Sequence, residues 1–367
     1  MSTDQTSSAS HGGITSVLVT GGAGFIGANL LNWAVKKFPS INFKCLDSLD
    51  YSGHLDNLAE IIQLPNFTFQ KVDICNVSAI QEVVESDRFD WVFHLAAQTH
   101  VDRSLQEPLK TVQTNVVGTS VLLDAFRIAW RGEPNHRFIH VSTDEVFGSV
   151  REGRFDEMSR YDPSSPYSAT KAASDHLARA YFRSYDFPVI VTNCCNNYGA
   201  FQFPEKLIPL TILRLLSNME VPIYGDGLQV REWIFVEDHV RGLWQTALCG
   251  QPGKTYLFGS NEESTNLGIV DTLCGLIAQF TGRAEEELKG LITHVEDRPG
   301  HDLRYAIDSS ETRVALGWDA NTQLKDGLRF VCEWYLEHHA WIKKVGGEKF
   351  DNWLQLQYSS RLRTPEV

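Results

Sequence analysis

The chain has no uninterrupted apolar run close to the roughly 18–20 residues that a membrane-spanning helix requires. A secretory signal is also missing, because residues 1–13 are rich in Ser, Thr and Gly and contain no apolar segment. We expect residues 1–13 to form a disordered tail. Internal repeats and further low-complexity tracts are absent as well. These absences favour a globular protein with no membrane partner.

Cysteine pairs with the spacing of a metal site are missing too. The seven cysteines include no C-x-x-C pair and have no histidine at ligand spacing. Most lie within apolar runs, so we expect buried free thiols rather than disulfides or metal ligands. They are Cys45, Cys75, Cys194, Cys195, Cys249, Cys274 and Cys332. The sequence therefore predicts no metal site and favours a cytoplasmic location.

Positive charge is in short supply. The chain carries 33 Lys and Arg against 46 Asp and Glu, a net charge of −13. Surfaces that bind nucleic acid are usually basic, so this balance argues against a nucleic-acid partner. It does not exclude a nucleotide ligand, because a few buried Arg or Lys side chains can dominate a pocket. With 367 residues, the chain can form one large α/β domain or two closely joined ones.

Short apolar segments alternate with longer helical patterns between residues 14 and 192. Several of these segments are continuously apolar, as expected for parallel strands buried on both faces. The expected strands are 14–20, 43–47, 67–73, 91–96, 138–142 and 189–192, and segments such as 27–38 and 114–130 are long enough for crossover helices. This alternation predicts an α/β fold with a doubly wound parallel sheet of the Rossmann type over residues 14–199.

The composition of the sequence and the pattern of expected elements change after Asn197. Residues 198–209 are rich in aromatics, Gly and Pro, and we expect an irregular functional loop there. The remainder mixes short strands (222–224, 233–235) with helices (267–280, 322–338). We interpret residues 200–345 as a smaller C-terminal α/β lobe that binds substrate, with some segments returning to the first domain. Residues 346–367 are expected to be a peripheral tail.

A glycine-rich turn follows the first strand directly. Gly21, Gly24 and Gly27 allow a sharp turn, close approach of a pyrophosphate and tight helix–strand packing. The helix that follows offers free N–H groups and the positive end of its dipole to phosphates. Asp47 ends the next strand, where a carboxylate can bind both ribose hydroxyls and repels a 2′-phosphate. This context predicts that residues 14–199 bind NAD rather than NADP.

Tyr167 and Lys171 are four residues apart and share one face of an expected helix. A tyrosine near a lysine ammonium and an oxidised nicotinamide is expected to have a lowered pKa, because positive charge favours the phenolate. It can then accept a hydroxyl proton while hydride leaves the same carbon. The pair predicts oxidation of an alcohol beside the nicotinamide.

Asp144 and Glu145 follow the strand 138–142, at the edge where open α/β sheets bind ligands. Two adjacent carboxyl groups exceed what alcohol oxidation needs. An acid and a base together suit removal of a proton from carbon while water leaves its neighbour. Helix capping by residues of this turn is the structural alternative, but the Tyr-Lys pair downstream favours catalysis.

Taken together, these residues resemble the extended short-chain dehydrogenase/reductase family. Within it, the chain is most similar to the nucleotide-sugar 4,6-dehydratases, and closest to those that act on dTDP-glucose. The resemblance runs from about residue 14 to 340. It is also carried by the segments 94–104, 142–148, 196–199, 203–209, 236–239 and 297–302. The stretch Thr143-Asp144-Glu145 is the part specific to dehydration.

The resemblance implies a closed cycle on NDP-glucose. Tyr167, assisted by Lys171, would remove the proton of the sugar's 4-hydroxyl while hydride passes from C4 to NAD. Glu145 would then take the C5 proton, protonated Asp144 would give a proton to the departing C6 hydroxyl, and Thr143 would hydrogen-bond the 4-oxygen. The hydride would return to C6, which gives NDP-4-keto-6-deoxyglucose, water and regenerated NAD. This scheme requires a raised pKa for Asp144.

The resemblance also implies binding residues. Its cofactor contacts fall on Phe25, Ile26, Asp47, Asp73, Ile74, Leu95, Ala96, Ala97, Thr114, Tyr167, Lys171 and Asn197. Its nucleotide-sugar contacts fall on Thr99, Asn196, Lys206, Leu207, Pro222, Tyr224, Arg231, Asn266, Arg298 and His301. Arg231 and Arg298 are the expected diphosphate partners, through charge-assisted hydrogen bonds. Family members commonly form homodimers through two helices per subunit, here the segments near 105–130 and 167–184.

Two departures from the family pattern leave the nucleobase open. Ala200-Phe201-Gln202-Phe203 stands where the bacterial dTDP-glucose enzymes have Pro-Tyr-His-Phe, and Gln98-Thr99 replaces a Glu-Ser pair. We expect dTDP-glucose as substrate, with UDP-glucose next. A 4-epimerase or a decarboxylase of UDP-sugars is an alternative, although such enzymes generally lack the adjacent Asp-Glu. A catalytically inactive NAD-sensing protein is another, but it would be expected to have lost Tyr167 or Lys171.

Overall fold

A computed structural model of the protein describes residues 13–133 and 135–346. Nearly all of the two expected tails, 1–13 and 346–367, lies outside these described residues. Seven parallel strands form the central sheet, in the order β10-β6-β5-β4-β1-β2-β3. They are β1 (Ser16–Thr20), β2 (Asn42–Asp47), β3 (Phe67–Lys71), β4 (Trp91–His94), β5 (Arg137–Thr143), β6 (Val189–Cys194) and β10 (Thr255–Phe258). The predicted doubly wound parallel sheet is confirmed.

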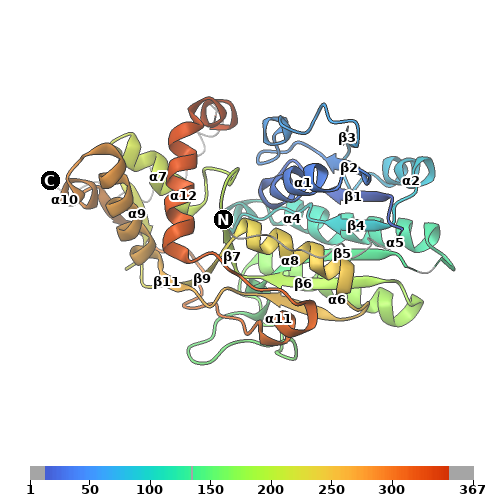
Figure 1. Ribbon diagram of the computed structural model, residues 1–367. Coiled ribbons are helices and arrows are strands. Elements are labelled where there is room, and N and C mark those ends of the chain that lie inside the picture. Colours follow the sequence, from blue (N-terminus) through green and yellow to red (C-terminus); the bar gives the residue numbers. More distant parts are fainter. Residues whose placement is uncertain (1–12, 134, 347–367) are drawn as a thin grey trace.

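Helices cover both faces of this sheet (Figure 1). Alternate residues of one strand serve the two layers: Val17 and Val19 belong to one core, while Leu18 belongs to the other. One face carries α1 (Phe25–Lys37), α8 (Val236–Cys249) and α11 (Ser310–Leu316), and the other carries α2 (Val77–Ser86), α3 (Val101–Gln106), α4 (Pro108–Val112), α5 (Thr119–Ala129) and α6 (Pro166–Tyr185). Burial on both faces explains the continuously apolar strands.

The expected crossover helix 114–130 is interrupted. A π-helical turn, η2 (Gln113–Gly118), separates α4 from α5. Inside this turn the Asn115 side chain accepts a hydrogen bond from Gln98 N at 2.8 Å and donates to Gln98 O at 3.0 Å. Its amide also donates to Thr170 on α6 at 2.9 Å. Turns of this kind recur at functional sites, and this one binds the loop after β4 to α6.

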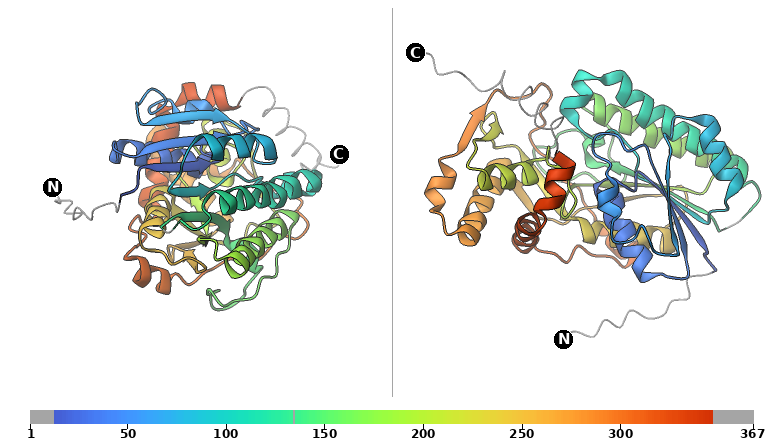
Figure 2. Two further views of the ribbon diagram at one scale, coloured as in Figure 1. Left: turned by 90° about the vertical axis from the view of Figure 1, so that its right-hand side faces the viewer. Right: turned by 90° about the horizontal axis from the view of Figure 1, so that it is seen from above.

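A second group of elements lies beside the sheet and has its own apolar core (Figures 1 and 2). Its helices are α7 (Leu207–Leu216), α9 (Asn266–Thr281), α10 (Glu285–Lys289) and α12 (Leu324–Glu337). Its strands are β8 (Val221–Tyr224) paired with β12 (Ile292–Val295), and β11 (Glu263–Thr265), β9 (Val230–Phe235) and β7 (Asn196–Tyr198). The expected loop 198–209 is shorter than predicted, because α7 accepts Pro209 in its first turn, where a missing N–H breaks no helical bond.

Two short 3₁₀ turns complete the described chain, η1 (Leu55–Leu58) and η3 (Asp144–Phe147). The second follows β5 without an intervening loop, so the predicted catalytic carboxyls stand at the carboxyl edge of the sheet. Among the helices of the described ranges, none is both long and apolar enough to cross a membrane.

Candidate active site

A cavity of about 590 Å³ opens at the carboxyl ends of the parallel strands and extends to the second group of elements. Open α/β sheets bind ligands at this edge. Every site residue predicted from the sequence lines the cavity except Asp144. The structure thus brings together residues that are as far apart in the chain as Gly21 and His301.

The glycine turn forms the cofactor end of the cavity. Gly21 has φ +70°, and a Cβ placed there would come within 2.5 Å of Ala96 N. A Cβ on Gly27 would lie 2.4 Å from Gly21 O, so helix α1 can pack on the turn only with glycine at this position. No described side chain caps the N-terminus of α1 at Gly24. Its first N–H groups therefore remain available to a pyrophosphate.

Asp47 ends β2 beside this turn. Its oxygens accept backbone hydrogen bonds from Ala23 at 3.0 Å and from Leu49 at 2.8 Å. Burial raises the pKa of Asp47, and the two backbone hydrogen bonds oppose that rise. Each carboxylate oxygen has a second lone pair, so the side chain can still accept hydrogen bonds from two ribose hydroxyls.

The remaining residues predicted for the cofactor line the same end of the cavity. They are Phe25, Ile26, Asp73, Ile74, Leu95, Ala96, Ala97, Thr114 and Asn197. The Asn197 side chain is held by hydrogen bonds to Cys195 O at 3.0 Å, to Cys194 Sγ at 3.3 Å and to the His239 ring at 2.9 Å. A turn that admits only glycine, a free helix N-terminus and a carboxylate at the end of β2 together fit a dinucleotide.

Helix α6 carries Tyr167 and Lys171 into the cavity. The helix begins with a reciprocal cap between Ser165 and Ser168 and with Pro166 in its first turn, which fixes the start of the helix. The Lys171 ammonium donates to Val141 O on β5 at 2.8 Å. The expected shared face of Tyr167 and Lys171 is therefore present, anchored to the sheet.

The predicted lowering of the Tyr167 pKa assumed an oxidised nicotinamide beside Lys171, and the protein's own residues act in the opposite direction. Burial and the nearby Glu145 carboxylate raise the pKa of Tyr167 well above its ordinary value. A hydrogen bond with the Thr143 hydroxyl acts in the opposite direction but does not outweigh them. The Lys171 ammonium keeps its charge while it donates to Val141 O, and an oxidised nicotinamide would add a second positive charge that favours the phenolate.

Thr143 and the two carboxyls form one tight turn after β5. The Thr143 hydroxyl accepts a hydrogen bond from Glu145 N at 3.2 Å and donates to Asp144 Oδ1 at 3.3 Å. Thr143 and Glu145 line the cavity, whereas Asp144 is 1% exposed and does not. Successive residues of a 3₁₀ turn point about 120° apart, which explains why the neighbours differ. No described residue contacts Asp144 Oδ2.

The surroundings of the two carboxyls favour different protonation states. Burial and the adjacent charges of Glu145 and Glu232 raise the pKa of Asp144 well above its ordinary value. Burial also raises the pKa of Glu145, but Arg298, Lys206 and Arg231 all oppose that rise. Asp144 therefore holds its proton more firmly than Glu145, as the scheme from the sequence requires.

Three cations surround the sugar end of the cavity. Lys206 donates to Thr99 O at 3.0 Å, and Arg231 donates to Asp302 O at 2.9 Å. The Arg231 guanidinium also lies 4.2 Å from the ring centre of Tyr305. Arg298 is the third, and it lines the cavity beside Lys206 and Arg231. Cations that line a cavity suit a diphosphate.

The other predicted substrate residues also line this end: Asn196, Leu207, Pro222, Tyr224, Asn266 and His301. The Tyr224 hydroxyl donates to Asp102 Oδ2 at 2.9 Å, which links β8 to α3. His301 Nδ1 lies 2.6 Å from Asp297 Oδ1. Burial and the Arg298 charge lower the pKa of His301 to about 4, so the ring is neutral and can hydrogen-bond.

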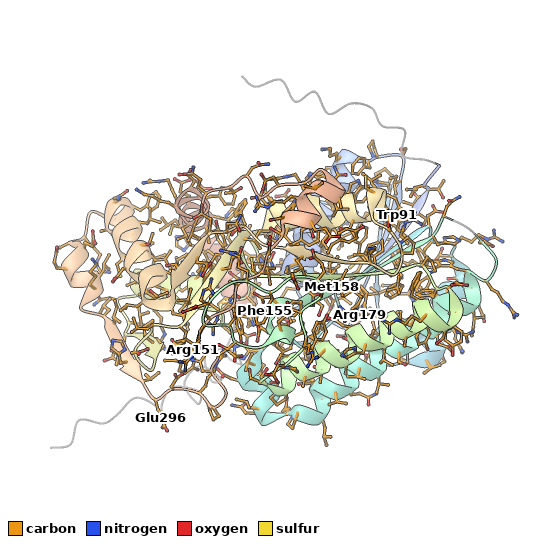
Figure 3. The ribbon with its side chains drawn as sticks, turned by 90° about the horizontal axis from the view of Figure 1, so that it is seen from below. Trp91, Arg151, Phe155, Met158, Arg179 and Glu296 are labelled. Atoms are coloured by element: carbon orange, nitrogen blue, oxygen red, sulfur yellow. The ribbon has the colours of Figure 1, made fainter. Side chains whose placement is uncertain are left out.

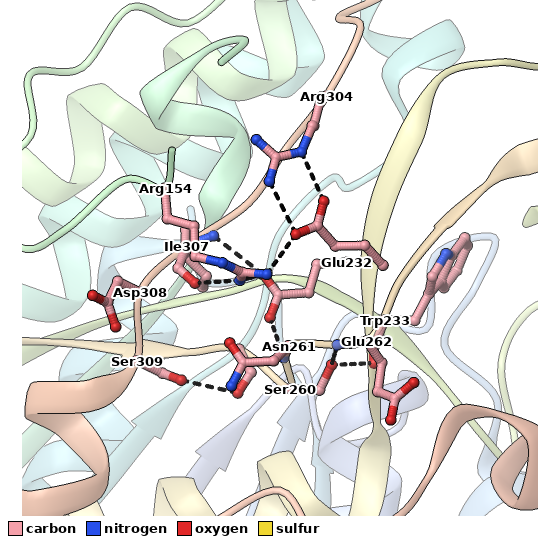
Figure 4. A network of polar contacts seen from close by, with 12 residues as sticks. Arg154, Glu232, Trp233, Ser260, Asn261, Glu262, Arg304, Ile307, Asp308 and Ser309 are labelled. Carbon is pink, nitrogen blue, oxygen red and sulfur yellow. Dashed lines mark hydrogen bonds and ion pairs between the residues drawn. The ribbon is translucent and has the colours of Figure 1, made fainter. Parts of the chain in front are cut away.

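An ionic network around the buried Glu232 lies next to residues of the sugar end (Figure 4). Glu232 accepts hydrogen bonds from Arg154 at 3.2 Å and from the backbone of Asn261 and Ile307. Arg304 forms a two-point ion pair with Glu263 at 2.7 and 3.0 Å. Adjacent residues of an extended segment face opposite sides. The network thus holds Glu232 and Arg304 on the side away from the cavity, and their neighbours Arg231 and Tyr305 line the cavity.

Several residues that line the sugar end were not predicted as site residues. The most prominent are Asp102, Glu205 and Tyr305. Arg103 donates to Glu205 Oε2 at 3.0 Å, and the Tyr305 hydroxyl donates to Asp302 at 2.5 Å. Asp102 and Glu205 lie inside segments that carried the family resemblance, so a signal for them was present. Tyr305 follows the last of those segments and had no such signal.

The parallel sheet, the glycine turn and the Tyr167–Lys171 helix define a dinucleotide-binding protein of the short-chain dehydrogenase/reductase type. The chain belongs to the GDP-mannose 4,6 dehydratase family, whose sequence profile matches residues 18–331. It is 45% identical over 342 residues to the dTDP-glucose 4,6-dehydratase of Neisseria meningitidis serogroup B, which covers 90% of this chain and 95% of the relative.

Solved structures show the same relationship. The dTDP-glucose 4,6-dehydratase of Streptomyces venezuelae, solved with NAD bound, has a TM-score of 0.84 and 39% identity, and the match covers 90% of this chain and all 100% of that one. The UDP-glucose 4-epimerase of Thermotoga maritima has a TM-score of 0.78 and 26% identity, covering 88% and 99% of the two chains. The expected family is confirmed, and its fold also supports epimerases.

Proposed function

We propose that the chain is an NAD-dependent NDP-glucose 4,6-dehydratase that produces NDP-4-keto-6-deoxyglucose and water. The observation that carries this proposal is the contrast between Asp144 and Glu145. Asp144 is buried beside other carboxylates, whereas Glu145 lines the cavity and is acted on by three cations. Elimination of water needs one group that gives a proton and one that takes a proton, and this contrast favours that division. The activity of the relatives supports the same reaction.

The cofactor end would hold NAD through the N-terminus of α1, the carboxylate of Asp47 and the cavity wall that contains Asp73 and Thr114. When bound, NAD accepts a hydride from C4 of the sugar and later returns it to C6. Asp47 favours a free ribose over a 2′-phosphate, because two negative charges repel each other. The relatives of known structure contain NAD, which supports this choice.

Tyr167 is assigned the proton acceptor for the 4-hydroxyl. Lys171 holds positive charge near α6 and fixes the helix to β5 through Val141. Thr143 lies within hydrogen-bonding reach of Tyr167, so its hydroxyl can hold the 4-oxygen beside the phenol. These three side chains belong to the oxidation and reduction steps of the cycle.

Glu145 and Asp144 are assigned the elimination. A ketone at C4 acidifies the C5 hydrogen, and Glu145 is the carboxylate that lines the cavity beside Tyr167. Asp144 keeps its proton and is the acid for the departing C6 hydroxyl. Its carboxyl accepts a hydrogen bond from the hydroxyl of Thr143, which lines the cavity. Loss of the C5 proton and of the C6 hydroxyl removes one molecule of water, and Glu145 would return its proton to C5 when the hydride adds to C6. The proton that Tyr167 takes from the 4-hydroxyl balances the one that Asp144 gives up.

The proposed nucleobase is thymine, with uracil as the second choice. The test is incubation of the purified protein with dTDP-, UDP- and GDP-glucose separately, followed by mass spectrometry of the product. Loss of one water from dTDP-glucose, faster than from the other two, is the expected result. Inversion at C4 with no loss of water would identify an epimerase and overturn the proposal.

A homodimer is proposed through α3–α5 and α6, which lie side by side on one exposed face (Figure 2). Apolar side chains that are exposed on the first of these segments are Leu105, Leu109, Val112, Val117 and Ile128. Leu109, with 83% of its surface exposed, is the most prominent. Exposed apolar patches of this kind commonly mark protein interfaces.

Light scattering of the purified protein tests the dimer. Leu109→Glu is expected to yield a monomer, because a buried unpaired charge is costly at an interface. Val314→Glu on α11, at an equally exposed position of 87%, is the control and should leave the dimer intact. A monomeric wild type, or equal effects of both variants, would contradict this interface.

We also propose a cytoplasmic location. All seven cysteines are free thiols, and five of them are buried. Reducing compartments keep thiols in this state. Fractionation of the source cells, with the protein detected by antibody, tests this assignment, and recovery outside the cytoplasm would contradict it.

A further inference from the structure

A buried carboxylate lies behind the reactive side of α6, and the reaction proposed above does not use it. Asp175 is 0% exposed and does not line the cavity. It follows Lys171 by four residues, so the two side chains are neighbours on one side of the helix. Burial of a carboxylate is costly unless hydrogen bonds and a positive charge compensate it. Its contacts therefore bear on its role.

Three neutral side chains from separate segments donate hydrogen bonds to Asp175. His140 on β5 lies 3.0 Å from Oδ1 through Nε2, and Tyr161 and Asn193 donate to Oδ2 at 2.8 and 3.1 Å. His140 Nδ1 has no hydrogen-bond partner among the described residues while Nε2 faces the carboxylate, which assigns the proton to Nε2. Burial and the Lys171 charge lower the pKa of His140, so the imidazole is neutral. These donors satisfy the oxygens without neutralising their charge.

Lys171 supplies the balancing charge. Burial lowers the pKa of Lys171, and the charge of Asp175 opposes that change. Burial alone would raise the pKa of Asp175, but the hydrogen bond from His140 and the charge of Lys171 outweigh it and lower the pKa. Arg179, labelled on α6 in Figure 3, donates to the Tyr161 oxygen at 2.7 Å rather than to the carboxylate.

The other groups around Lys171 are neutral. His94 on β4 is buried, which lowers its pKa well below the ordinary value. Burial raises the pKa of the Cys194 thiol on β6 to about 12. His140 is neutral for the reason given above. Among the described groups that act electrostatically on Lys171, Asp175 is therefore the one anion at neutral pH.

Asp175 is also connected to the catalytic turn. The same Asn193 amide that donates to the carboxylate donates to Thr143 O at 3.0 Å. Asn193 stands opposite Ser142 in the β5–β6 pairing, next to the end of β5. One carboxylate thus acts on the charge of Lys171 and on the backbone that presents Thr143.

We propose that Asp175 is a positioning residue of this active site: it is the buried counter-charge of the Lys171 ammonium and, through Asn193, holds the end of β5 that carries Thr143. The roles of Lys171 and Thr143 rest on the proposed function. The pairing of the two charges does not, and it can be tested without substrate.

The first experiment is a double-mutant cycle in thermal stability. Asp175→Asn removes the charge and keeps the shape, while Lys171→Met removes the cation. The single Asp175→Asn variant is expected to melt well below the wild type, because it leaves a buried ammonium uncompensated. Adding Lys171→Met should restore part of the loss, because both charges are then gone. Strictly additive losses would overturn the pairing. If the single Asp175→Asn variant fails to fold, a folded double variant would support the pairing and an unfolded one would contradict it.

The second experiment isolates the oxidation step. In a Glu145→Gln background, which blocks elimination, reduction of the cofactor by dTDP-glucose is followed by absorbance as a function of pH. The Lys171 ammonium is lost as pH rises through its pKa. Without Asp175 that pKa falls, so Asp175→Asn should move the basic midpoint down by about one unit or more. Tyr161→Phe removes one donor but keeps the charge, and should leave the midpoint unchanged.

The outcomes separate the two proposals. An unchanged midpoint together with additive stability losses would make Asp175 a contact between α6 and the sheet and nothing more. If the wild type forms no 4-keto-6-deoxy product, the proposed function fails, while the stability cycle still tests the charge pair.

Discussion

The two ends of the cavity differ in the groups that form them. The cofactor end consists mainly of backbone, namely a glycine turn and a helix N-terminus. It also includes the carboxylate of Asp47. At the sugar end, charged side chains from elements that are distant in the chain line the cavity, and Arg231 and Arg298 act electrostatically on Glu145. The first end is a feature of local geometry, and the second depends on the assembled fold.

This difference predicts different consequences of mutation. A backbone site fails when a side chain is added, because the close approach is lost. A site of balanced charges fails when one charge is removed, because its partners are then left unbalanced in a medium of low polarity. Changes at the sugar end should therefore alter catalysis or substrate binding and leave NAD bound, while changes in the glycine turn should lower NAD retention.

The largest effect is expected at Glu145. Glu145→Gln removes the base and should lower kcat for dehydration by roughly two or more orders of magnitude, the usual scale for a lost acid or base. Asp144→Asn should have a similar effect through loss of the acid. The measurement is product formation at saturating dTDP-glucose, with NAD content determined after denaturation. Glu286→Gln, an exposed position on α10, is the control, and wild-type rates in both catalytic variants would refute the assignment.

Arg231→Met should mainly weaken binding of the substrate. Charge-assisted hydrogen bonds contribute about 1.5–3 kcal/mol, so KM should rise roughly tenfold to a hundredfold with little change in NAD content. Steady-state kinetics with dTDP-glucose measure this. The matched control is Arg151→Met, on the exposed segment labelled in Figure 3. A normal KM with reduced NAD content would reverse the proposed division of the cavity.

Gly21→Ala should affect the cofactor end alone. The added Cβ would lie 2.5 Å from Ala96 N, at a φ of +70°. Strain at such a position costs about 1–3 kcal/mol, so both the melting temperature and NAD retention should fall. Gly132→Ala has a similar φ of +79° but meets no atom within 4 Å, so it carries the backbone cost without the clash. Equal effects in the two variants would show that close packing at the turn is unimportant.

The smallest effect concerns pH. Activity needs Glu145 as a carboxylate, so it is lost as pH falls through the pKa of that group. Since burial raises this pKa, the acid limb of kcat should lie above the range of an ordinary glutamate. Arg298→Met removes one opposing cation, which raises the pKa further and should move the acid limb to higher pH. An acid limb that does not move would show that Arg298 has no effect on the pKa of Glu145.

The sequence predicted the cofactor end well because its signals are local. The turn from Gly21 to Gly27 and the carboxylate of Asp47 each follow a strand directly, and the structure puts them where that order implies. The parallel sheet followed from the same reasoning. Strand β10 was missed, because a short strand that joins from the C-terminal half has no neighbouring βα pattern to reveal it.

The sugar end could be predicted only in part. The family resemblance supplied Lys206, Arg231 and Arg298, but no spacing rule reveals that three distant cations act on Glu145. The burial of Asp144 beneath the cavity surface depends on the 3₁₀ geometry of one turn. The raised pKa of Tyr167 depends on three-dimensional burial. Such properties arise from the assembled fold and have no counterpart in a local motif.

The central claim is that water is removed while a hydride from C4 is held away from the sugar. The most direct test uses dTDP-glucose that carries deuterium at C4, with the product analysed by mass spectrometry and NMR. We expect a 4-keto-6-deoxy sugar that has lost one water and carries the deuterium at C6. Deuterium that returns to C4 in an inverted sugar, with no water lost, would contradict it.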